Sequence, residues 1–167
     1  MPQSIVVMGV SGAGKSSVGQ ALAAQLGADF IDGDTLHPEA NVRKMTAGVP
    51  LSDGDRWPWL HLVGTTLSNS LENPTVVACS ALKRSYRDAI RVAAPATTFI
   101  LLKADRPALQ DRLTQRPGHF MPASLLTSQL ETLEELQNDE SGLTIESAGG
   151  VDKTVERIRK LLEQASN

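Results

Sequence analysis

The chain has 167 residues, of which 41% are hydrophobic and 21% charged, and its formal net charge is −3. This length suits one domain with a shared core, and no stretch has the roughly 20 apolar residues of a membrane-spanning helix. The slight acidic excess argues against a dedicated nucleic-acid surface, which needs clustered basic residues. We therefore expect a single domain over residues 1–167 with no nucleic-acid or membrane partner.

The cysteine content points to a cellular location. Cys79 is the one cysteine in the sequence, so it cannot form a disulfide within the chain. The first residues lead into a strand pattern without the basic and apolar stretches of a secretion signal. These features predict a protein of the reducing cytoplasm.

Short apolar runs alternate with helical patterns along the chain. The runs cover residues 5–8, 29–32, 76–79, 98–102 and 143–145. Between them, apolar side chains recur every three or four residues, as in Val18, Leu22 and Leu26; in Leu60, Val63, Leu67 and Leu71; and in Val151, Val155, Ile158 and Leu162. This alternation predicts a three-layer α/β sandwich, with a mostly parallel five-stranded sheet and helices on both faces. Such sheets bind ligands beyond the carboxyl ends of their strands.

A glycine-rich segment follows the first run directly and precedes a helical pattern. It reads Gly9-Val10-Ser11-Gly12-Ala13-Gly14-Lys15-Ser16, with Ser17 next. This matches G-x-x-x-x-G-K-S, the phosphate loop of P-loop NTPases, in its expected strand–helix setting. Glycines let successive N–H groups turn towards phosphate oxygens, so residues 9–17 are the predicted ATP site. Lys15 is expected to contact the β- and γ-phosphates as a catalytic residue, and Ser16 to coordinate Mg²⁺.

Other segments indicate which nucleotide enzyme this is. No N-K-x-D or T-K-x-D sequence is present to read guanine, and Ala78-Cys79-Ser80 lacks the acidic residue of many motor ATPases. The second run ends in Asp32-Gly33-Asp34, whose carboxylates share a side of an extended chain. We expect Asp34 to be the general base of a kinase and Asp32 to support hydrated Mg²⁺; the alternative is that both merely form a turn.

Beyond the phosphate loop, the chain resembles the small bacterial gluconate kinases, relatives of shikimate and adenylate kinases. The segments that carry the resemblance are residues 32–38 with Asn41, Lys44 and Met45; 48–60; 79–83 with 86–88; and 119–122 with Leu125, Leu126, Ser128 and Gln129. The resemblance implies transfer of the γ-phosphoryl group of ATP to the 6-hydroxyl of D-gluconate, giving 6-phosphogluconate and ADP. It also suggests a homodimer.

A linear polyhydroxy acid needs a cation for its carboxylate and polar groups for its hydroxyls. The candidates for these contacts are Asp34, His37, Asn41, Arg56 and Lys83. Arg56 is the first choice for the carboxylate, because a guanidinium pairs bidentately with it. We expect Arg56 just before a helix, where the related shikimate kinases present a carboxylate-binding arginine. A solvated surface cation is the alternative for Arg56 and Lys83, and Trp57 and Trp59 either line this pocket or pack in the core.

A lid is expected after the fourth strand. Pro117 and Gly118 end a helical pattern at residues 109–113 and predict a short connection, followed by a helix over 123–136. The resemblance implies that residues 116–128, approximately, close over ATP, with Arg112 stacked on adenine and Arg116 moving onto the β- and γ-phosphates. It also implies that residues 147–150 run past the adenine edge. His119 is expected to be a packing or loop residue.

Two other functions remain open from the sequence. The first is another small-metabolite kinase of this fold, of the shikimate or adenylylsulfate type. Shikimate kinases carry a Gly-Gly-Gly turn after the third strand, and Cys79-Ser80-Ala81 in its place favours gluconate. The second is a nucleotide-dependent regulatory switch, which is disfavoured because no guanine-reading motif or effector region is visible.

Overall fold

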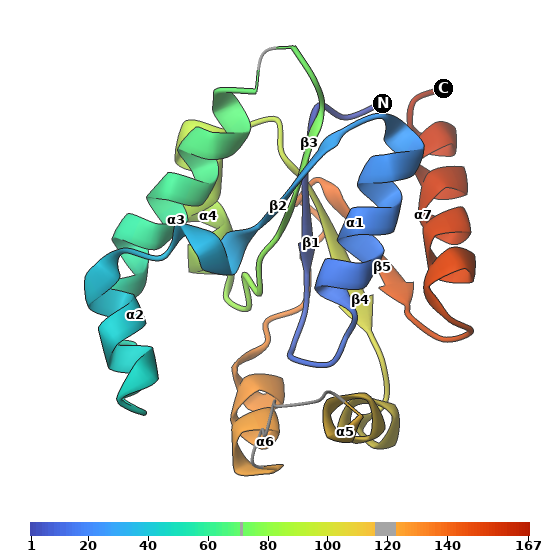
Figure 1. Ribbon diagram of the computed structural model, residues 1–167. Helices are drawn as coiled ribbons and strands as arrows, with labels where there is room; N and C mark the ends of the chain where they lie inside the picture. The colour runs from blue at the N-terminus through green and yellow to red at the C-terminus, as the bar shows by residue number, and fades with distance from the viewer. Residues whose placement is uncertain (71, 116–122) are drawn as a thin grey trace.

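The computed structural model describes residues 1–70, 72–115 and 123–167 (Figure 1). The strands are β1 Ser4–Met8, β2 Asp29–Asp32, β3 Thr75–Ala78, β4 Thr98–Lys103 and β5 Gly142–Glu146. The helices are α1 Lys15–Leu26, α2 Glu39–Thr46, α3 Asp53–Ser68, α4 Arg84–Ala93, α5 Arg106–Thr114, α6 Ala123–Thr132 and α7 Val151–Ala165, with a short 3₁₀ helix, η1, at Gly33–Leu36. In these ranges no helix is long and apolar enough to cross a membrane.

The sheet confirms the predicted topology. Its strand order is β2-β3-β1-β4-β5, and all neighbouring strands are parallel. β1 is central, with Val6 in register with Val77 on one side and Phe99 on the other. The loops that follow β1 and β3 are therefore neighbours, and the N–H of Gly9 donates to the carbonyl of Ser80 at 3.3 Å.

Two hydrophobic clusters cover the two faces of the sheet. Alternate side chains of β1 point to opposite faces, so Ile5 and Val7 pack with residues of α1 and α7, whereas Val6 and Met8 pack with residues of α3 and α4. Figure 1 shows the same helix pairs on either side of the sheet, with α5 and α6 near the carboxyl ends of the strands. The three-layer sandwich is thus confirmed.

Two sequence-based expectations about helices change, and a third concerns a residue outside the described ranges. The predicted helix over 123–136 ends at Thr132, because the N–H of Glu134 donates to the carbonyl of Leu82 at 2.8 Å instead of continuing the helix. Leu71, the last residue of one predicted stripe, lies outside the described residues. Arg56 lies inside the first turn of α3 rather than before the helix, because Ser52 and Asp55 form a capping box that starts the helix at Asp53.

Candidate active site

The phosphate loop connects β1 to α1 at the carboxyl edge of the sheet. Gly9, Gly12 and Gly14 have φ of 146°, 85° and 97°, which other residues rarely adopt. A Cβ on Gly9 would lie 2.8 Å from the carbonyl oxygen of Leu102, so this turn also needs glycine for close packing. Gly14 is the N-cap of α1 and has no side chain to occupy the first N–H groups of the helix. The loop therefore presents the backbone donors of an anion site.

Lys15 begins α1, Asp32 ends β2 and Asp34 lies in η1, all at the carboxyl edge of the sheet. The Nζ atom of Lys15 donates to the carbonyl of Val10 at 3.0 Å, which folds the side chain back along the phosphate loop. Burial raises the pKa of the Cys79 thiol to about 12, and the charges of Asp34, Lys15 and Asp32 also act on that thiol. All three charges therefore act on the residue that follows β3.

Asp32 and Asp34 differ in their surroundings. The Oδ1 atom of Asp32 accepts a 3.0 Å bond from the N–H of Asp34, and this caps η1. Asp32 therefore does form a turn, as the alternative interpretation expected, and its role near Mg²⁺ stays a prediction. The side chain of Asp34 is exposed at the same sheet edge as the phosphate loop, where an acceptor molecule can reach it.

His37 and Asn41 form a partly buried polar group beside η1. The Nδ2 atom of Asn41 lies 3.2 Å from Nδ1 of His37 and donates to the carbonyl of Asp55 at 2.8 Å. The His37 ring stacks on Trp59 with centroids 4.1 Å apart. Burial is the main cause that lowers the pKa of His37; the Asp34 carboxylate opposes this and Arg56 adds to it. His37 is thus biased towards its neutral form.

The two tryptophans take different positions. Trp59 is buried and its Nε1 donates to the carbonyl of Gly33 at 2.8 Å, so it packs beneath η1 in the core. Trp57 is exposed and meets the ring of Tyr86 edge-on, with centroids 5.7 Å apart. Trp59 therefore follows the core interpretation, and Trp57 lies at the surface near the predicted carboxylate site.

The structure brings Arg56 and Lys83 to one carboxylate. Nη1 of Arg56 lies 3.8 Å from Oδ1 of Asp53, and Nζ of Lys83 lies 3.3 Å from its Oδ2. The hydroxyl of Tyr86 donates to Oδ1 of Asp53 at 2.5 Å, and Arg56 also donates to the carbonyl of Leu51 at 2.8 Å. The bond from Tyr86 is the main cause that lowers the pKa of Asp53.

Asp53 and Tyr86 are not among the candidates that sequence reasoning selected. Both lie in segments that carry the resemblance to gluconate kinases, and this resemblance is the sequence feature that could have identified them. Their contact spans 33 positions and forms because α3 packs on α4. Residue spacing along the chain does not reveal such a contact.

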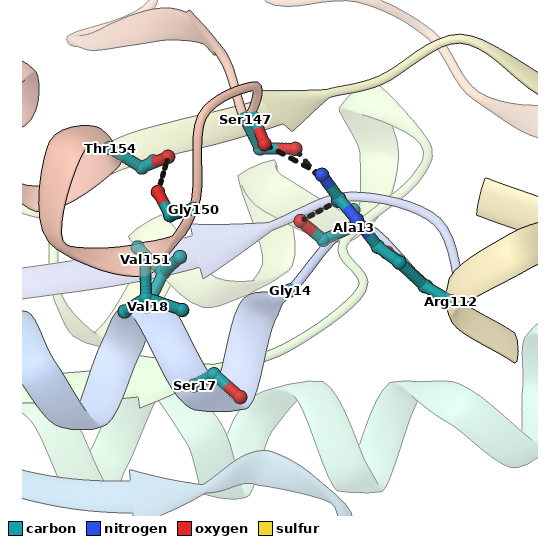
Figure 2. A pocket seen from close by; sticks show the side chains of 10 residues that line it. Ala13, Gly14, Ser17, Val18, Arg112, Ser147, Gly150, Val151 and Thr154 are labelled. Atoms are coloured by element: carbon teal, nitrogen blue, oxygen red, sulfur yellow. Dashed lines mark hydrogen bonds between the residues drawn. The ribbon is translucent and has the colours of Figure 1, made fainter. Parts of the chain in front are cut away.

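A cavity of about 210 Å³ lies on the nucleotide side of the phosphate loop (Figure 2). Its walls come from the phosphate loop and α1, from α5, and from the connection between β5 and α7. The lining residues are Gly12, Ala13, Gly14, Ser17, Val18, Arg112, Ser147, Gly150, Val151 and Thr154. This places Arg112 and part of segment 147–150 beside the predicted ATP phosphate site.

Arg112 joins two walls of that cavity. Its Nη1 donates to the carbonyls of Gly12 and Ala13 at 3.2 and 3.3 Å and to Oγ of Ser147 at 3.0 Å. Its Nη2 donates to the carbonyl of Ser147 at 2.6 Å. These bonds hold the guanidinium between the phosphate loop and the β5–α7 connection, and its stacking on adenine stays a prediction.

The predicted lid is described only in its last part. Arg116 and His119 lie outside the described residues, and residues 123–128 belong to α6. From α6, Oε1 of Gln129 accepts a 2.7 Å bond from the N–H of Ser11. The helix that contains the last part of the predicted lid segment is therefore bonded to the phosphate loop.

The residues present fit a magnesium–nucleotide complex. Within the described ranges, no group of three or more His, Cys, Asp and Glu side chains forms a metal site. Mg²⁺ in nucleotide enzymes is held by one or two protein oxygens together with phosphates and water. The Ser16 hydroxyl and the Asp32 carboxylate are such oxygen donors, at the start of α1 and the end of β2.

Comparisons with known proteins agree with this arrangement. The family model described as Shikimate kinase matches residues 11–165. A gluconokinase from Gluconobacter oxydans is 46% identical over 159 residues, covering 94% of this chain and 89% of the relative. The crystal structure of a gluconokinase from Sinorhizobium meliloti superimposes with a TM-score of 0.85 at 46% identity and covers 99% of this chain and 98% of that one. An unliganded sugar kinase from Janibacter sp. gives a TM-score of 0.88 at 39% identity, covering 98% and 95%.

Proposed function

Because this chain belongs to the shikimate kinase family and, within it, to the gluconokinases, we propose that it phosphorylates D-gluconate at the 6-hydroxyl with Mg·ATP. The observation that carries the proposal is the 46% identity to a gluconokinase over 94% of the chain. The site supports it, since the phosphate loop follows β1, the exposed Asp34 follows β2, and Lys83, which follows β3, shares the Asp53 carboxylate with Arg56 of α3. The products would be 6-phosphogluconate and ADP.

The proposed reaction is an in-line displacement. The 6-hydroxyl oxygen forms a bond to the γ-phosphorus while the bond from that phosphorus to the leaving oxygen of ADP breaks. Asp34 accepts the hydroxyl proton, and its exposed position at the end of β2 suits this role. Lys15 and the N–H groups of the phosphate loop stabilise the charge on the transferred group. Bound Mg²⁺, held by Ser16 and Asp32, would neutralise the charge on the β- and γ-phosphate oxygens.

The other predicted contacts complete the proposal. We propose that His37 and Asn41, which contact each other, bind acceptor hydroxyls and that Arg56 and Lys83 bind the acceptor carboxylate. Arg112 is proposed for the adenine side and Arg116 for the γ-phosphate. We also propose a cytoplasmic location and a homodimer, on the resemblance and on the lone Cys79; light scattering coupled to gel filtration measures the mass of the assembly.

The test is a coupled assay of ADP release with Mg·ATP and a panel of acceptors: gluconate, shikimate, adenylylsulfate, nucleoside monophosphates and other sugar acids. We expect turnover on gluconate, reduced by about 10²- to 10⁴-fold in Asp34→Asn because the general base is lost. Asp29→Asn is a matched control. Asp29 is exposed at the amino end of β2, whereas Asp34 follows the carboxyl end of that strand. Preferred turnover on another acceptor would overturn the gluconate assignment, and ATP binding without any acceptor-dependent turnover would favour a regulatory switch.

A further inference from the structure

Two hydrogen-bond donors, Lys83 and Tyr86, and a further cation, Arg56, surround the side chain of Asp53. Asp53 and Arg56 belong to the first turn of α3, Lys83 is the residue before α4, and Tyr86 lies in its first turn. Both cations also lie over the ring of Tyr86 as cation–π contacts, with Arg56 and Lys83 5.6 and 5.5 Å from its centroid. The ring of Tyr86 therefore contacts both cations, while its hydroxyl is hydrogen-bonded to the Asp53 carboxylate.

The three charged side chains of this cluster are open to a small molecule, whereas Tyr86 is buried with its hydroxyl on Asp53. The side chain of Asp53 is 46% exposed, and those of Lys83 and Arg56 are 34% and 32% exposed. Ion pairs at such exposure are weak, so a carboxylate from solution is able to compete for the same donors. The two cations leave one positive charge after Asp53 is counted, which matches the single negative charge of a monocarboxylate.

We propose that Asp53 occupies the acceptor's carboxylate site in the free enzyme, and that Tyr86 donates its hydroxyl to the acceptor carboxylate once Asp53 is displaced. This rests on the proposed function, because it concerns the acid group of the same acceptor. When no acceptor is bound, the Asp53 carboxylate holds the positive charges of Arg56 and Lys83 close together. Because the acceptor must displace Asp53, its affinity is lower than it would be without this carboxylate. Tyr86 becomes a specificity-determining residue alongside Arg56 and Lys83.

The first experiment compares wild type with Asp53→Asn by calorimetric titration of gluconate and by its KM. Asparagine keeps the size of the side chain but lacks the competing charge, so we expect the gluconate Kd and KM to fall by about two- to fivefold. Asp88→Asn is a charge-matched control on the exposed side of α4 and should leave both values unchanged. Asp53→Ser also removes the carboxylate and repeats the test if the asparagine variant is poorly folded.

A neutral acceptor separates charge competition from a change in shape. Glucitol has the same chain length as gluconate without the carboxylate, so its KM should be the same in wild type and Asp53→Asn. An unchanged or raised gluconate Kd in both Asp53 variants would overturn the proposal. So would an equal gain for glucitol, because it would mean that Asp53 only restricts access.

The role of Tyr86 is tested in the Asp53→Asn background, where no carboxylate competes for its hydroxyl. Adding Tyr86→Phe should raise the gluconate Kd by about three- to tenfold and leave that of glucitol unchanged, because one hydrogen bond to a charged group is lost. An unchanged gluconate Kd would remove Tyr86 from the site. Wild-type turnover on gluconate is measured in the same series, so a failure of the proposed function is distinguishable from a failure of this inference.

Discussion

The N–H of Ser11 in the phosphate loop donates a 2.7 Å hydrogen bond to Oε1 of Gln129 on α6, 118 positions later in the chain. Just beyond the C-terminal end of α6, Glu134 is bonded to the loop after β3. Its N–H donates to the carbonyl of Leu82, and its carboxylate accepts from the N–H of Arg84, both at 2.8 Å. α6 and the residues that follow it therefore bridge the ATP side and the proposed acceptor side of the site.

The bond to Ser11 predicts that Gln129 positions the phosphate loop. Gln129→Met keeps the length of the side chain but removes the acceptor, so the KM for ATP should rise by about two- to tenfold while the KM for gluconate stays nearly constant. Gln129→Glu keeps an acceptor but adds a negative charge beside the phosphate site, so it should weaken ATP binding more. Steady-state kinetics with each substrate varied and calorimetry with ATP measure both effects.

The control for these variants is Glu131→Gln, an exposed position on the same helix. It should leave ATP affinity unchanged. Equal losses of ATP affinity in Glu131→Gln and Gln129→Met would mean that the substitutions act by destabilising α6 and not through the bond to Ser11.

The close contact of α3 with α4 predicts opposite effects of one substitution at two glycines of α3. A Cβ on Gly64 would lie 2.7 Å from the carbonyl oxygen of Ile90 and 3.1 Å from Cβ of Ala93, whereas at Gly54 the nearest atom is Oγ of Ser52 at 3.7 Å. Gly54→Ala should stabilise the protein by a few tenths to about 1 kcal/mol, because alanine is the better helix former. Gly64→Ala should destabilise it by about 1–3 kcal/mol through overpacking.

Urea unfolding of both glycine variants measures the two free energies. If Gly64→Ala were as stable as Gly54→Ala, the two helices would not be packed as closely as the structure shows. Because Asp53 and Arg56 on α3 contact Tyr86 on α4 and Lys83 just before it, Gly64→Ala should also raise the KM for gluconate.

The strands were the most predictable part of the fold. Buried parallel strands are apolar on both faces, so they read as short continuous runs, and all five runs coincide with strands to within one residue at each end. The end of α6 was less predictable. The leucine pattern continues past Thr132, and only the tertiary bond from Glu134 to Leu82 ends the helix there.

The site was predictable where a motif carries it. The phosphate loop and the Asp32–Asp34 pair have fixed spacings within one segment, and both lie where the sequence placed them. Asp53 and Tyr86 were missed because their contact depends on how two helices pack. The link between Arg112 and Ser147 likewise joins α5 to the connection after β5, 35 positions apart.

Glu140 predicts a loss of stability in acid. It is buried against Arg87, which is itself fully buried, at 2.7 Å. Burial alone would raise the pKa of Glu140, but hydrogen bonds from Arg87, the N–H of Gln137 and Arg91 outweigh it and lower the pKa from 4.5 to about 2. The unfolded chain then binds the proton first as pH falls, so about 3 kcal/mol of stability, present above pH 4.5, is lost between pH 4.5 and pH 2.

Unfolding free energies measured from pH 7 to pH 2 check the Glu140 prediction. Glu140→Gln should cost about 3–5 kcal/mol at pH 7, because it leaves Arg87 buried without its partner, and should flatten the curve below pH 4.5. Asp139→Asn is the exposed comparison, since the Asp139 side chain is 70% exposed on Arg84, and should cost under about 1 kcal/mol. A curve of unchanged steepness in Glu140→Gln would assign the acid loss to other carboxylates.

The contacts of Arg112 predict that ATP affinity depends on the planar shape of its guanidinium group and not only on its positive charge. Two of its nitrogens bond to the phosphate loop and to Ser147 at the same time, and a lysine ammonium lacks this planar fork. Arg112→Lys should therefore raise the Kd for ATP by about tenfold, since at least one hydrogen bond between the cavity walls is lost, and leave gluconate binding unchanged. Calorimetry with ATP and with gluconate measures the two affinities separately. The control is Arg159→Lys on α7, where the side chain is 42% exposed.

If Arg112→Lys bound ATP as well as wild type, a positive charge alone would be sufficient for ATP binding. The wall formed by Arg112 and Ser147 would then not shape the nucleotide site.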